Sequence, residues 1–215
     1  MGIKSIFALG IFVLVSNTIY GNVLEDKVNY ILSDEFIETT NKLANGMWVA
    51  ERSFHPKTSK RYLLGLLGVH PDNHLHMPPR RPNNYYLEEE LADFPTNFDP
   101  RKNWPQCPSI SKILNQAGCG SCWAFGAAGA MSDRLCIHSP NNEVKVDVSP
   151  ENLLCCCHLC GFGCGGGYLA PAWNYWKRQG IVTGGGYGSH EGCQSYYIGP
   201  DDFCYDLKCT PRCIR

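Results

Sequence analysis

All thirteen cysteines of this chain lie between Cys107 and Cys213. A cysteine density this high is typical of domains stabilised by disulfides in an oxidising compartment, and an odd number leaves at least one thiol unpaired. The abrupt change in composition predicts two units of different character, a cysteine-free N-terminal region and a disulfide-rich C-terminal region. Any fold of the second region must bring cysteines that are distant in the sequence close together.

The first residues have the pattern of a secretory signal peptide. Lys4 supplies a positive charge, an almost uninterrupted apolar run extends from Ile6 to Val15, and small or polar residues continue to Gly21. Because this run is too short to cross the core of a bilayer, we predict that residues 1–21 are cleaved off and that no membrane is a partner. The formal net charge of -1, without a long basic run, also argues against nucleic acid as a partner.

The cysteine-free region is expected to be helical at first and extended later. Apolar residues recur at helical spacing over residues 24–32, and Ser33 can cap a second helix that begins at Asp34 and stops at Gly46. Residues 70–84 are rich in Pro, Asn and Arg, which predicts an extended linker. By itself this region could be a small helical domain on a flexible tether.

Three helices are predicted in the cysteine-rich region. Residues 121–137 are dense in small side chains, which suits a buried central helix that other backbone approaches closely. Ser149 is a cap followed directly by a proline, which opens a second helix over residues 150–154. The third helix covers residues 171–179, with Gly180 as its stop, and the chain after it is expected to be loop.

The most specific motif runs from Gln116 to Gly126 and reads QAGCGSCWAFG. Its Cys-Gly-Ser-Cys-Trp core resembles the nucleophile segment of papain-like cysteine proteases. A thiol attacks an acyl carbon as the thiolate, and Cys122 stands at the expected start of a helix, where free N–H groups and the macrodipole favour negative charge. The same N–H groups can hold the oxyanion of a tetrahedral intermediate. Cys122 is therefore the candidate nucleophile.

Other interpretations of these cysteines remain open. Cys119 and Cys122 could both belong to disulfides, as in most isolated C-x-x-C pairs of secreted proteins, or form a thioredoxin-like redox pair. Cys157, Cys160 and Cys164 could instead bind zinc. The residues around the motif favour a nucleophile, and the secretory route favours a disulfide cluster, so we expect no metal and no cofactor.

From about residue 25 to residue 215 the chain resembles cathepsin B precursors. The matching segments are Trp48-x-Ala50-x-x-x-Phe54, the motif around Cys122, Met131–His138, Cys156-Cys157 with Cys160 and Cys164, Gly165–Tyr168 and Ser189–Cys193. The resemblance implies a propeptide over residues 22–93 that lies through the cleft as an intramolecular inhibitor. It further implies that residues 94–215 are the N-terminal part of a peptidase domain acting on peptide or protein substrates. The expected location is a lysosome or the extracellular space, for example a gut lumen.

The resemblance also implies individual roles. Gln116 would donate its side-chain amide to the oxyanion, Trp123 would shield the site, and Gly166 and Gly167 would present backbone to the substrate. The implied disulfides are Cys107–Cys136, Cys119–Cys164, Cys157–Cys160, Cys156–Cys213 and Cys204–Cys209. Cys193 is left without a partner, and Cys155 has no counterpart.

The loop of the oxyanion donor departs from the family pattern. Ala117 stands where glycine is usual after the glutamine, so a positive φ at this position would strain the loop by about 1 kcal/mol.

The implied fold is α+β and papain-like, made mainly of the helical, disulfide-rich left domain with a helical propeptide, and with the β-rich right domain largely missing. The partner His and Asn are expected about 130–150 residues after Cys122, and none of His138, His158 and His190 is expected to replace the base. Cathepsin B carries an occluding loop in this region, with a pair of histidines that captures the C-terminal carboxylate of a substrate, whereas the segment between Cys204 and Cys209 contains no histidine. The resemblance therefore implies a cysteine-type endopeptidase precursor more than an exopeptidase. We expect this chain by itself to be inactive. The alternative is a non-catalytic pseudoprotease or a propeptide-type inhibitor of related proteases.

Overall fold

The computed structural model describes residues 33–55, 58–79 and 94–204. The predicted signal peptide, the helix predicted over residues 24–32, Cys209 and Cys213 lie outside the described residues. The chain forms two compact units, Met1–Leu63 and Leu64–Arg215.

The first unit contains the helix predicted after Ser33. Helix α2 (Asp34–Ala44) begins where the Ser33 hydroxyl accepts a hydrogen bond from the backbone N–H of Phe36 at 3.1 Å. It ends at Asn45, which adopts the left-handed conformation with φ of 46°. The predicted cap and stop are therefore confirmed, with the left-handed residue one position earlier than Gly46.

A short return segment follows α2 in this unit. The side-chain amide of Asn41 donates to the carbonyl of Ala50 at 3.0 Å and accepts from its N–H at 2.6 Å. Trp48 and Phe54, two residues of the propeptide-like motif, line one pocket with Phe36 of α2. Helix α3 (Lys60–Gly65) then leads into the second unit.

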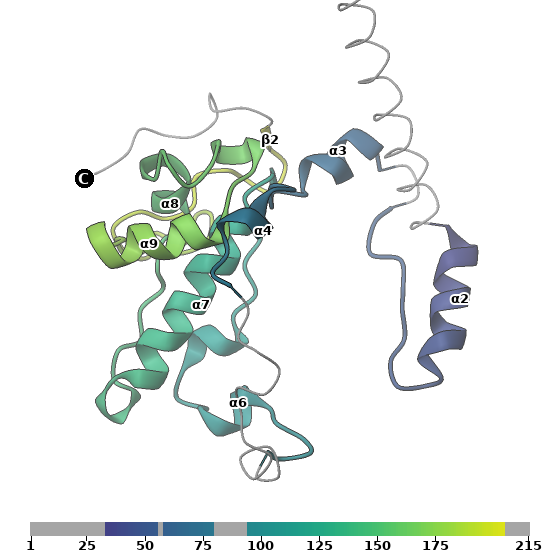
Figure 1. Ribbon diagram of the computed structural model, residues 1–215, viewed down its shortest axis with the longest axis horizontal. Coiled ribbons are helices and arrows are strands. Elements are labelled where there is room, and N and C mark those ends of the chain that lie inside the picture. Colours follow the sequence, from purple (N-terminus) through teal and green to yellow (C-terminus); the bar gives the residue numbers. More distant parts are fainter. Residues whose placement is uncertain (1–32, 56–57, 80–93, 205–215) are drawn as a thin grey trace, which may run out of the picture. The chain divides into compact units, whose positions relative to one another are not determined.

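The second unit is mainly helical (Figure 1). Its elements in chain order are α4 (Asn73–His76), α6 (Pro100–Asn103), η1 (Pro108–Ser111), β1 (Gly118–Cys119), α7 (Cys122–His138), η2 (Pro140–Asn142), α8 (Pro150–Cys156), η3 (Gly163–Gly165), α9 (Leu169–Gln179) and β2 (Phe203–Cys204). The three predicted helices correspond to α7, α8 and α9, and all three are confirmed. Helix α7 packs against both α8 and α9.

The core of this unit is built around α7. Ala124, Ala127 and Ala128 are buried along the helix together with Met131. Small side chains let neighbouring elements approach closely, so the prediction of a buried central helix is confirmed. Helix α8 is buried along its whole length and contributes Leu153 to the same cluster.

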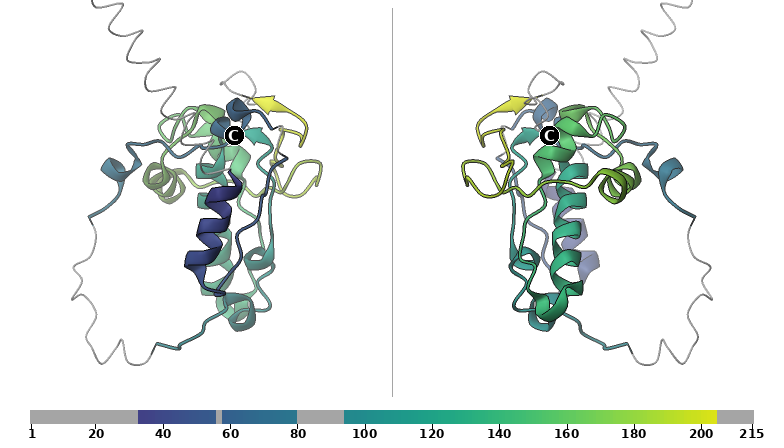
Figure 2. Two further views of the ribbon diagram at one scale, coloured as in Figure 1. Left: turned by 90° about the vertical axis from the view of Figure 1, so that its right-hand side faces the viewer. Right: turned by 90° about the vertical axis from the view of Figure 1, so that its left-hand side faces the viewer.

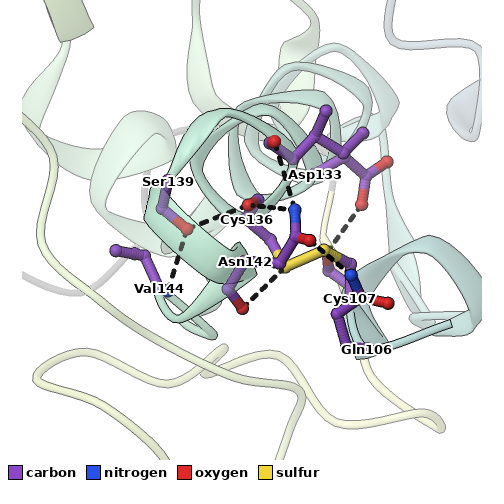
Figure 3. The surroundings of a disulfide bond; sticks show 9 residues. Gln106, Cys107, Asp133, Cys136, Ser139, Asn142 and Val144 are labelled. Atoms are coloured by element: carbon purple, nitrogen blue, oxygen red, sulfur yellow. Dashed lines mark hydrogen bonds between the residues drawn. A yellow bond between two sulfur atoms is a disulfide. The ribbon is translucent and has the colours of Figure 1, made fainter. Parts of the chain in front are cut away.

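The C-terminal end of α7 is held by a disulfide and by two capping side chains (Figure 3). Cys136 is bonded to Cys107 in the segment before η1. The Ser139 hydroxyl donates to the Cys136 carbonyl at 2.9 Å, and the Asn142 amide donates to the same carbonyl at 3.1 Å. The last carbonyls of a helix lack partners within it, so these side chains complete its end.

Two further disulfides join Cys119 to Cys164 and Cys157 to Cys160. All three observed pairs are among those implied by the resemblance. Cys156 and Cys204 are also disulfide-bonded. Among the described residues the free cysteines are Cys122, which is half-buried, Cys155, which is buried, and Cys193, which is exposed.

A two-residue parallel pair of strands precedes the N-terminal end of α7. Gly118 of β1 pairs with Phe203 of β2, and Cys119 pairs with Cys204. Both views of Figure 2 show the two strands beside the N-terminal end of α7. Strand β2 is short and lies in a region expected to be loop. In the described part of the chain, no helix has both the length and the apolar character needed to cross a membrane.

The prediction of an extended linker over residues 70–84 is wrong for its described part. Residues 73–76 form α4, and Val69 makes a parallel bridge to Gly167. The N–H of Gly167 donates to the Gly68 carbonyl at 2.8 Å, and the N–H of His70 donates to the Gly167 carbonyl at 3.0 Å. These backbone bonds join segments about one hundred residues apart, and local composition carries no signal for them.

Candidate active site

Cys122 is the first residue of α7, as the motif predicts. Its thiol is free and half-buried, and it accepts a hydrogen bond from the backbone N–H of Gly68 at 3.1 Å. The first-turn N–H groups of a helix favour negative charge nearby. Cys122 therefore has a suitable position for a nucleophile. Residues 64–77, called here the blocking segment, bring the Gly68 N–H against its thiol.

Gln116 meets the same blocking segment. Its side-chain amide donates to the carbonyl of Cys119 at 2.7 Å and to the carbonyl of Leu66 at 3.1 Å. The first bond fixes the amide within its own loop, and the second binds a carbonyl oxygen that comes from outside it. Since Leu66 and Gly68 are only two residues apart, Gln116 and Cys122 lie within reach of one short stretch of backbone.

The loop of Gln116 contains a strained residue. Ala117 is 4% exposed and has φ of 55°, a left-handed conformation that is unfavourable for alanine. Its N–H donates to the Asn115 side-chain oxygen at 2.8 Å, and the following Gly118 N–H donates to the Asp202 carbonyl at 3.1 Å. The positive φ considered from the sequence is thus present, and neighbouring contacts maintain it.

Gly167 and Trp123 lie against each other beside the blocking segment. A Cβ at Gly167 would lie 2.6 Å from the indole ring of Trp123, so only glycine fits there. Trp123 is fully buried, and its indole N–H donates to the Gly163 carbonyl at 3.3 Å. Trp123 therefore packs directly against the backbone of the glycine segment. Gly166 is also buried, and it directly precedes Gly167, the residue whose backbone pairs with the blocking segment.

The blocking segment is fixed beyond Gly167 as well. The Asn73 side-chain oxygen accepts from the N–H of Leu169 at 2.9 Å, at the first residue of α9. Tyr168, the N-cap residue of α9, makes no side-chain cap of its own. Its ring lies 4.9 Å from His70 and 4.4 Å from His76, measured between ring centroids. The segment thus supplies the cap that α9 lacks and contacts Tyr168 with two imidazole rings.

Tyr196 was not recognised from the sequence, yet it contacts two elements of the site. Its side chain is 2% exposed, and its hydroxyl donates to the Gln116 carbonyl at 2.9 Å. The same hydroxyl lies 2.9 Å from the hydroxyl of Ser121, the residue directly before Cys122. Burial raises the pKa of Tyr196, so the phenol keeps its proton. The contact joins residues 75 positions apart, and no sequence motif predicts it.

The alternative interpretations of the cysteines do not fit this arrangement. Cys119 pairs with Cys164, so it forms neither a disulfide nor a redox pair with Cys122. Cys157 and Cys160 are bonded to each other, so no cysteine of the proposed zinc set is available as a ligand. In the part of the chain that the structure describes, no group of three or more metal-binding side chains converges.

Comparison with known protein families assigns the arrangement. A family model described as papain family cysteine protease matches residues 94–213, and one described as peptidase family C1 propeptide matches residues 32–73. The chain belongs to the papain family of cysteine proteases. The predicted papain-like fold and thiol protease class are thereby confirmed.

Within this family the chain is similar to cathepsin B-like precursors. It is 40% identical to the cathepsin B-like cysteine proteinase 6 of Caenorhabditis elegans over 198 residues, which cover 85% of this chain and 51% of that protein. It is 43% identical to a cathepsin B-like cysteine proteinase of Schistosoma japonicum over 169 residues, which cover 77% and 47%. The chain therefore spans about half the length of these curated relatives.

A solved structure shows the same relationship. The structure of proCathepsin B S9 from Trypanosoma congolense matches with a TM-score of 0.64 and 32% identity, covering 86% of this chain and 58% of that chain. The predicted resemblance to a cathepsin B-like precursor is confirmed by both kinds of comparison.

Papain-family proteases pair their thiol with an imidazole, and none is bonded to Cys122 among the described residues. The only hydrogen-bond partner of its thiol in that part of the chain is Gly68. His138 is the last residue of α7 and therefore lies at the opposite end of the helix from Cys122. His158 and His190 are exposed, in the cysteine cluster and in the loop after α9, respectively.

A buried carboxyl group lies in α8 of the papain-family domain. Glu151 is fully buried, its Oε2 accepts from the Tyr197 N–H at 3.1 Å, and its Oε1 has no hydrogen-bond partner among the described residues. Burial raises the pKa of Glu151 to about 7, and the bond from Tyr197 only partly offsets it. Nothing in the local sequence distinguishes this glutamate from an exposed first-turn glutamate.

Proposed function

We propose that this chain is the precursor of a cysteine-type endopeptidase in which Cys122 is the nucleophile and Gln116 an oxyanion donor. The observation that carries the proposal is the placement of one backbone stretch across both side chains. Leu66 gives its carbonyl to the Gln116 amide, while Gly68 gives its N–H to the Cys122 thiol. A site that binds a peptide carbonyl beside a free thiol has the arrangement that acyl transfer requires.

In this proposal the blocking segment is an intramolecular inhibitor. It pairs its backbone with Gly167, where a peptide substrate would pair, and it occupies the hydrogen-bond donor of Gln116. Gly68 is the point of closest approach, because a Cβ there would overlap the carbonyl oxygen of Gly120. Only glycine permits this approach, so the backbone at residue 68 fits the site more closely than other residues could.

Residues 1–215 by themselves are proposed not to turn over peptides. The described histidines do not bond to the thiol, and without an imidazole the leaving amine receives no general acid assistance. Measurable hydrolysis by the purified, processed chain that disappears in Cys122→Ser would overturn this part of the proposal.

The nucleophile itself is tested by covalent labelling. After removal of the blocking segment by limited proteolysis, a peptidyl vinyl sulfone should modify Cys122 in preference to the exposed thiol of Cys193, and iodoacetamide should discriminate less. The preference is expected because the peptide part of the reagent binds at Gly167 and Gln116 while iodoacetamide does not. Equal modification of the two thiols by both reagents would contradict the assignment.

The proposed location is the secretory pathway, in a lysosome or outside the cell. The disulfides Cys107–Cys136, Cys119–Cys164 and Cys157–Cys160 support it, since such bonds form and persist in oxidising compartments. Loss of these bonds in protein isolated from its native source would contradict it.

The contacts of the blocking segment favour one alternative, a non-catalytic role as an inhibitor of related proteases. A segment that fits this cleft through Gly68 and Asn73 could bind the cleft of a relative in the same way. Inhibition of an active cathepsin B-like enzyme by residues 22–93 would support the alternative, and absence of inhibition at saturating concentration would exclude it.

A further inference from the structure

We infer that Tyr196 is a positioning residue of the active site, whose single hydroxyl joins the loop of Gln116 to the first turn of α7 and so sets the oxyanion donor relative to Cys122. The inference rests on the proposed function, because it assigns Tyr196 a role through Gln116 and Cys122. Tyr196 belongs to neither the nucleophile motif nor the glycine segment.

The direction of the hydrogen bonds follows from the number of protons. A phenol has one O–H, and Tyr196 uses it toward the Gln116 carbonyl at 2.9 Å. The contact between Tyr196 and Ser121, also 2.9 Å, must then be donated by the serine hydroxyl. Ser121 therefore donates to Tyr196, and Tyr196 donates to Gln116, which forms one continuous chain of hydrogen bonds across the site.

Ser121 behaves unusually for a residue at the N-cap of a helix. A serine there normally accepts a hydrogen bond from the first turn of its own helix, but the Ser121 side chain makes no such bond. Its hydroxyl is fully buried and bonds to Tyr196 instead. The first turn of α7 is thus tied to the rest of the site through Tyr196, and no capping oxygen of Ser121 competes for its N–H groups.

The loop of Gln116 is strained, so it needs stabilising contacts from residues outside the loop. Ala117 is held at φ of 55°, and a loop in an unfavourable conformation persists only where its surroundings over-determine it. Asn115 and Asp202 hold the N–H groups of Ala117 and Gly118, and Tyr196 holds the carbonyl of Gln116. Of these contacts, only the one from Tyr196 also reaches the residue beside the nucleophile.

The tyrosine itself is held rigidly. Its ring packs edge-on against Phe125 of α7 with ring centroids 4.7 Å apart, and its N–H donates to the Gly185 carbonyl at 2.9 Å. A phenylalanine at this position would keep the ring packing and lose only the hydroxyl. Tyr196→Phe therefore separates the positioning role from a role in the core.

The test compares Tyr196→Phe with Tyr197→Phe in the full chain, since Tyr197 is the exposed neighbour. Hydrogen exchange at the amides of Ala117 and Gly118 should be about tenfold faster in Tyr196→Phe, the effect of losing one buried hydrogen bond, and unchanged in Tyr197→Phe. Alkylation of Cys122 by iodoacetamide, followed on its tryptic peptide, should rise by up to about tenfold because Gln116 holds Leu66 less firmly.

A positioning role predicts one further result, in a double variant. In a Gln116→Ala background, Tyr196→Phe should have no additional effect on Cys122 alkylation. The backbone carbonyl that Tyr196 binds is still present there, but the side-chain amide that holds Leu66 is gone. A purely structural tyrosine would change alkylation equally in both backgrounds, and that result would overturn the inference. Faster exchange at Ala117 without any change at Cys122 would overturn it as well.

Two controls keep the outcome decisive. If Tyr196→Phe does not fold, as judged by urea unfolding, Ser121→Ala breaks the same chain of hydrogen bonds at its other end. It leaves the bond from Tyr196 to the Gln116 carbonyl intact, so it should raise Cys122 alkylation without the full acceleration of exchange at Ala117. If Cys122 proves unreactive toward the vinyl sulfone in the processed chain, the proposed function fails. The exchange at Ala117 still shows whether the Tyr196 hydroxyl stabilises the loop of Gln116. Normal reactivity of Cys122, with Tyr196→Phe indistinguishable from Tyr197→Phe, refutes the positioning role alone.

Discussion

Glu151→Gln should change the pH dependence of folding. Glu151 is fully buried, its Oε1 has no hydrogen-bond partner in the described part of the chain, and burial raises its pKa from 4.5 to about 7. A raised pKa means that the folded state binds the proton more tightly than the unfolded state does. The stabilisation from the protonated form is therefore complete below pH 4.5 and is lost as the pH rises to about 7.

The magnitude follows from the two pKa values. At about 1.4 kcal/mol for each pH unit, the raised pKa corresponds to a loss of about 3 kcal/mol between pH 4.5 and pH 8. Glutamine cannot ionise, so Glu151→Gln removes this loss. It also places an amide group where Oε1 has no partner, which costs about 1 kcal/mol at every pH. The variant should accordingly be slightly less stable than the parent at pH 4.5 and about 2 kcal/mol more stable at pH 8.

The assay is urea unfolding followed by tryptophan fluorescence at pH 4.5, 6 and 8. The informative quantity is the difference in unfolding free energy between variant and parent. The other carboxylates titrate in both proteins, so their contributions cancel in this difference. Glu143→Gln, at an exposed position, is the matched control and should show no pH-dependent difference. A difference for Glu151→Gln that stays constant from pH 4.5 to pH 8 would refute the account of its buried charge.

Three other substitutions test separate contacts. Asn73→Ala removes the cap that the blocking segment gives to α9, so alkylation of Cys122 in the full chain should rise by up to about tenfold, and Asn73→Asp should restore the parental rate. Ala117→Gly relieves the left-handed alanine and should raise the unfolding free energy by up to about 1 kcal/mol in urea; a lower value would contradict the strain. Ser149→Ala removes a buried cap bond to α8 and a bond to a loop carbonyl, and should lower the unfolding free energy by about 2 kcal/mol. An unchanged urea midpoint for Ser149→Ala would show that neither bond contributes.

The helices could be predicted because their signals are local. Ser33 and Ser149 mark helix starts through their own side-chain bonds, and Gly180 marks the end of α9. The nucleophile segment was recognisable for a similar reason, since Cys122 and Gln116 belong to one contiguous motif. The helix boundaries were predicted less accurately. Helix α9 begins at Leu169, two residues before the predicted start at Pro171.

The remaining features depend on contacts between distant parts of the chain. The backbone of residues 68–70 is ordered by bonds to Gly167, and its Pro- and Asn-rich surroundings indicated a linker instead. Tyr196 reaches Gln116 across eighty positions, and Glu151 differs from an exposed glutamate only through its burial. Such relations are determined by packing in three dimensions, so periodicity and capping rules cannot find them.

In the proposed precursor, the backbone at Gly68 covers the reactive thiol of Cys122. Gly68→Ala tests it directly, because the added Cβ would overlap the Gly120 carbonyl and lift the blocking segment from the thiol. Gly129→Ala is the matched control, since a Cβ there meets nothing within 4 Å.

The measurement is the rate of Cys122 alkylation relative to that of Cys193 within the same molecule at pH 6. The ratio should rise by about tenfold or more in Gly68→Ala and stay at the parental value in Gly129→Ala. An unchanged ratio in folded Gly68→Ala would contradict this role of Gly68.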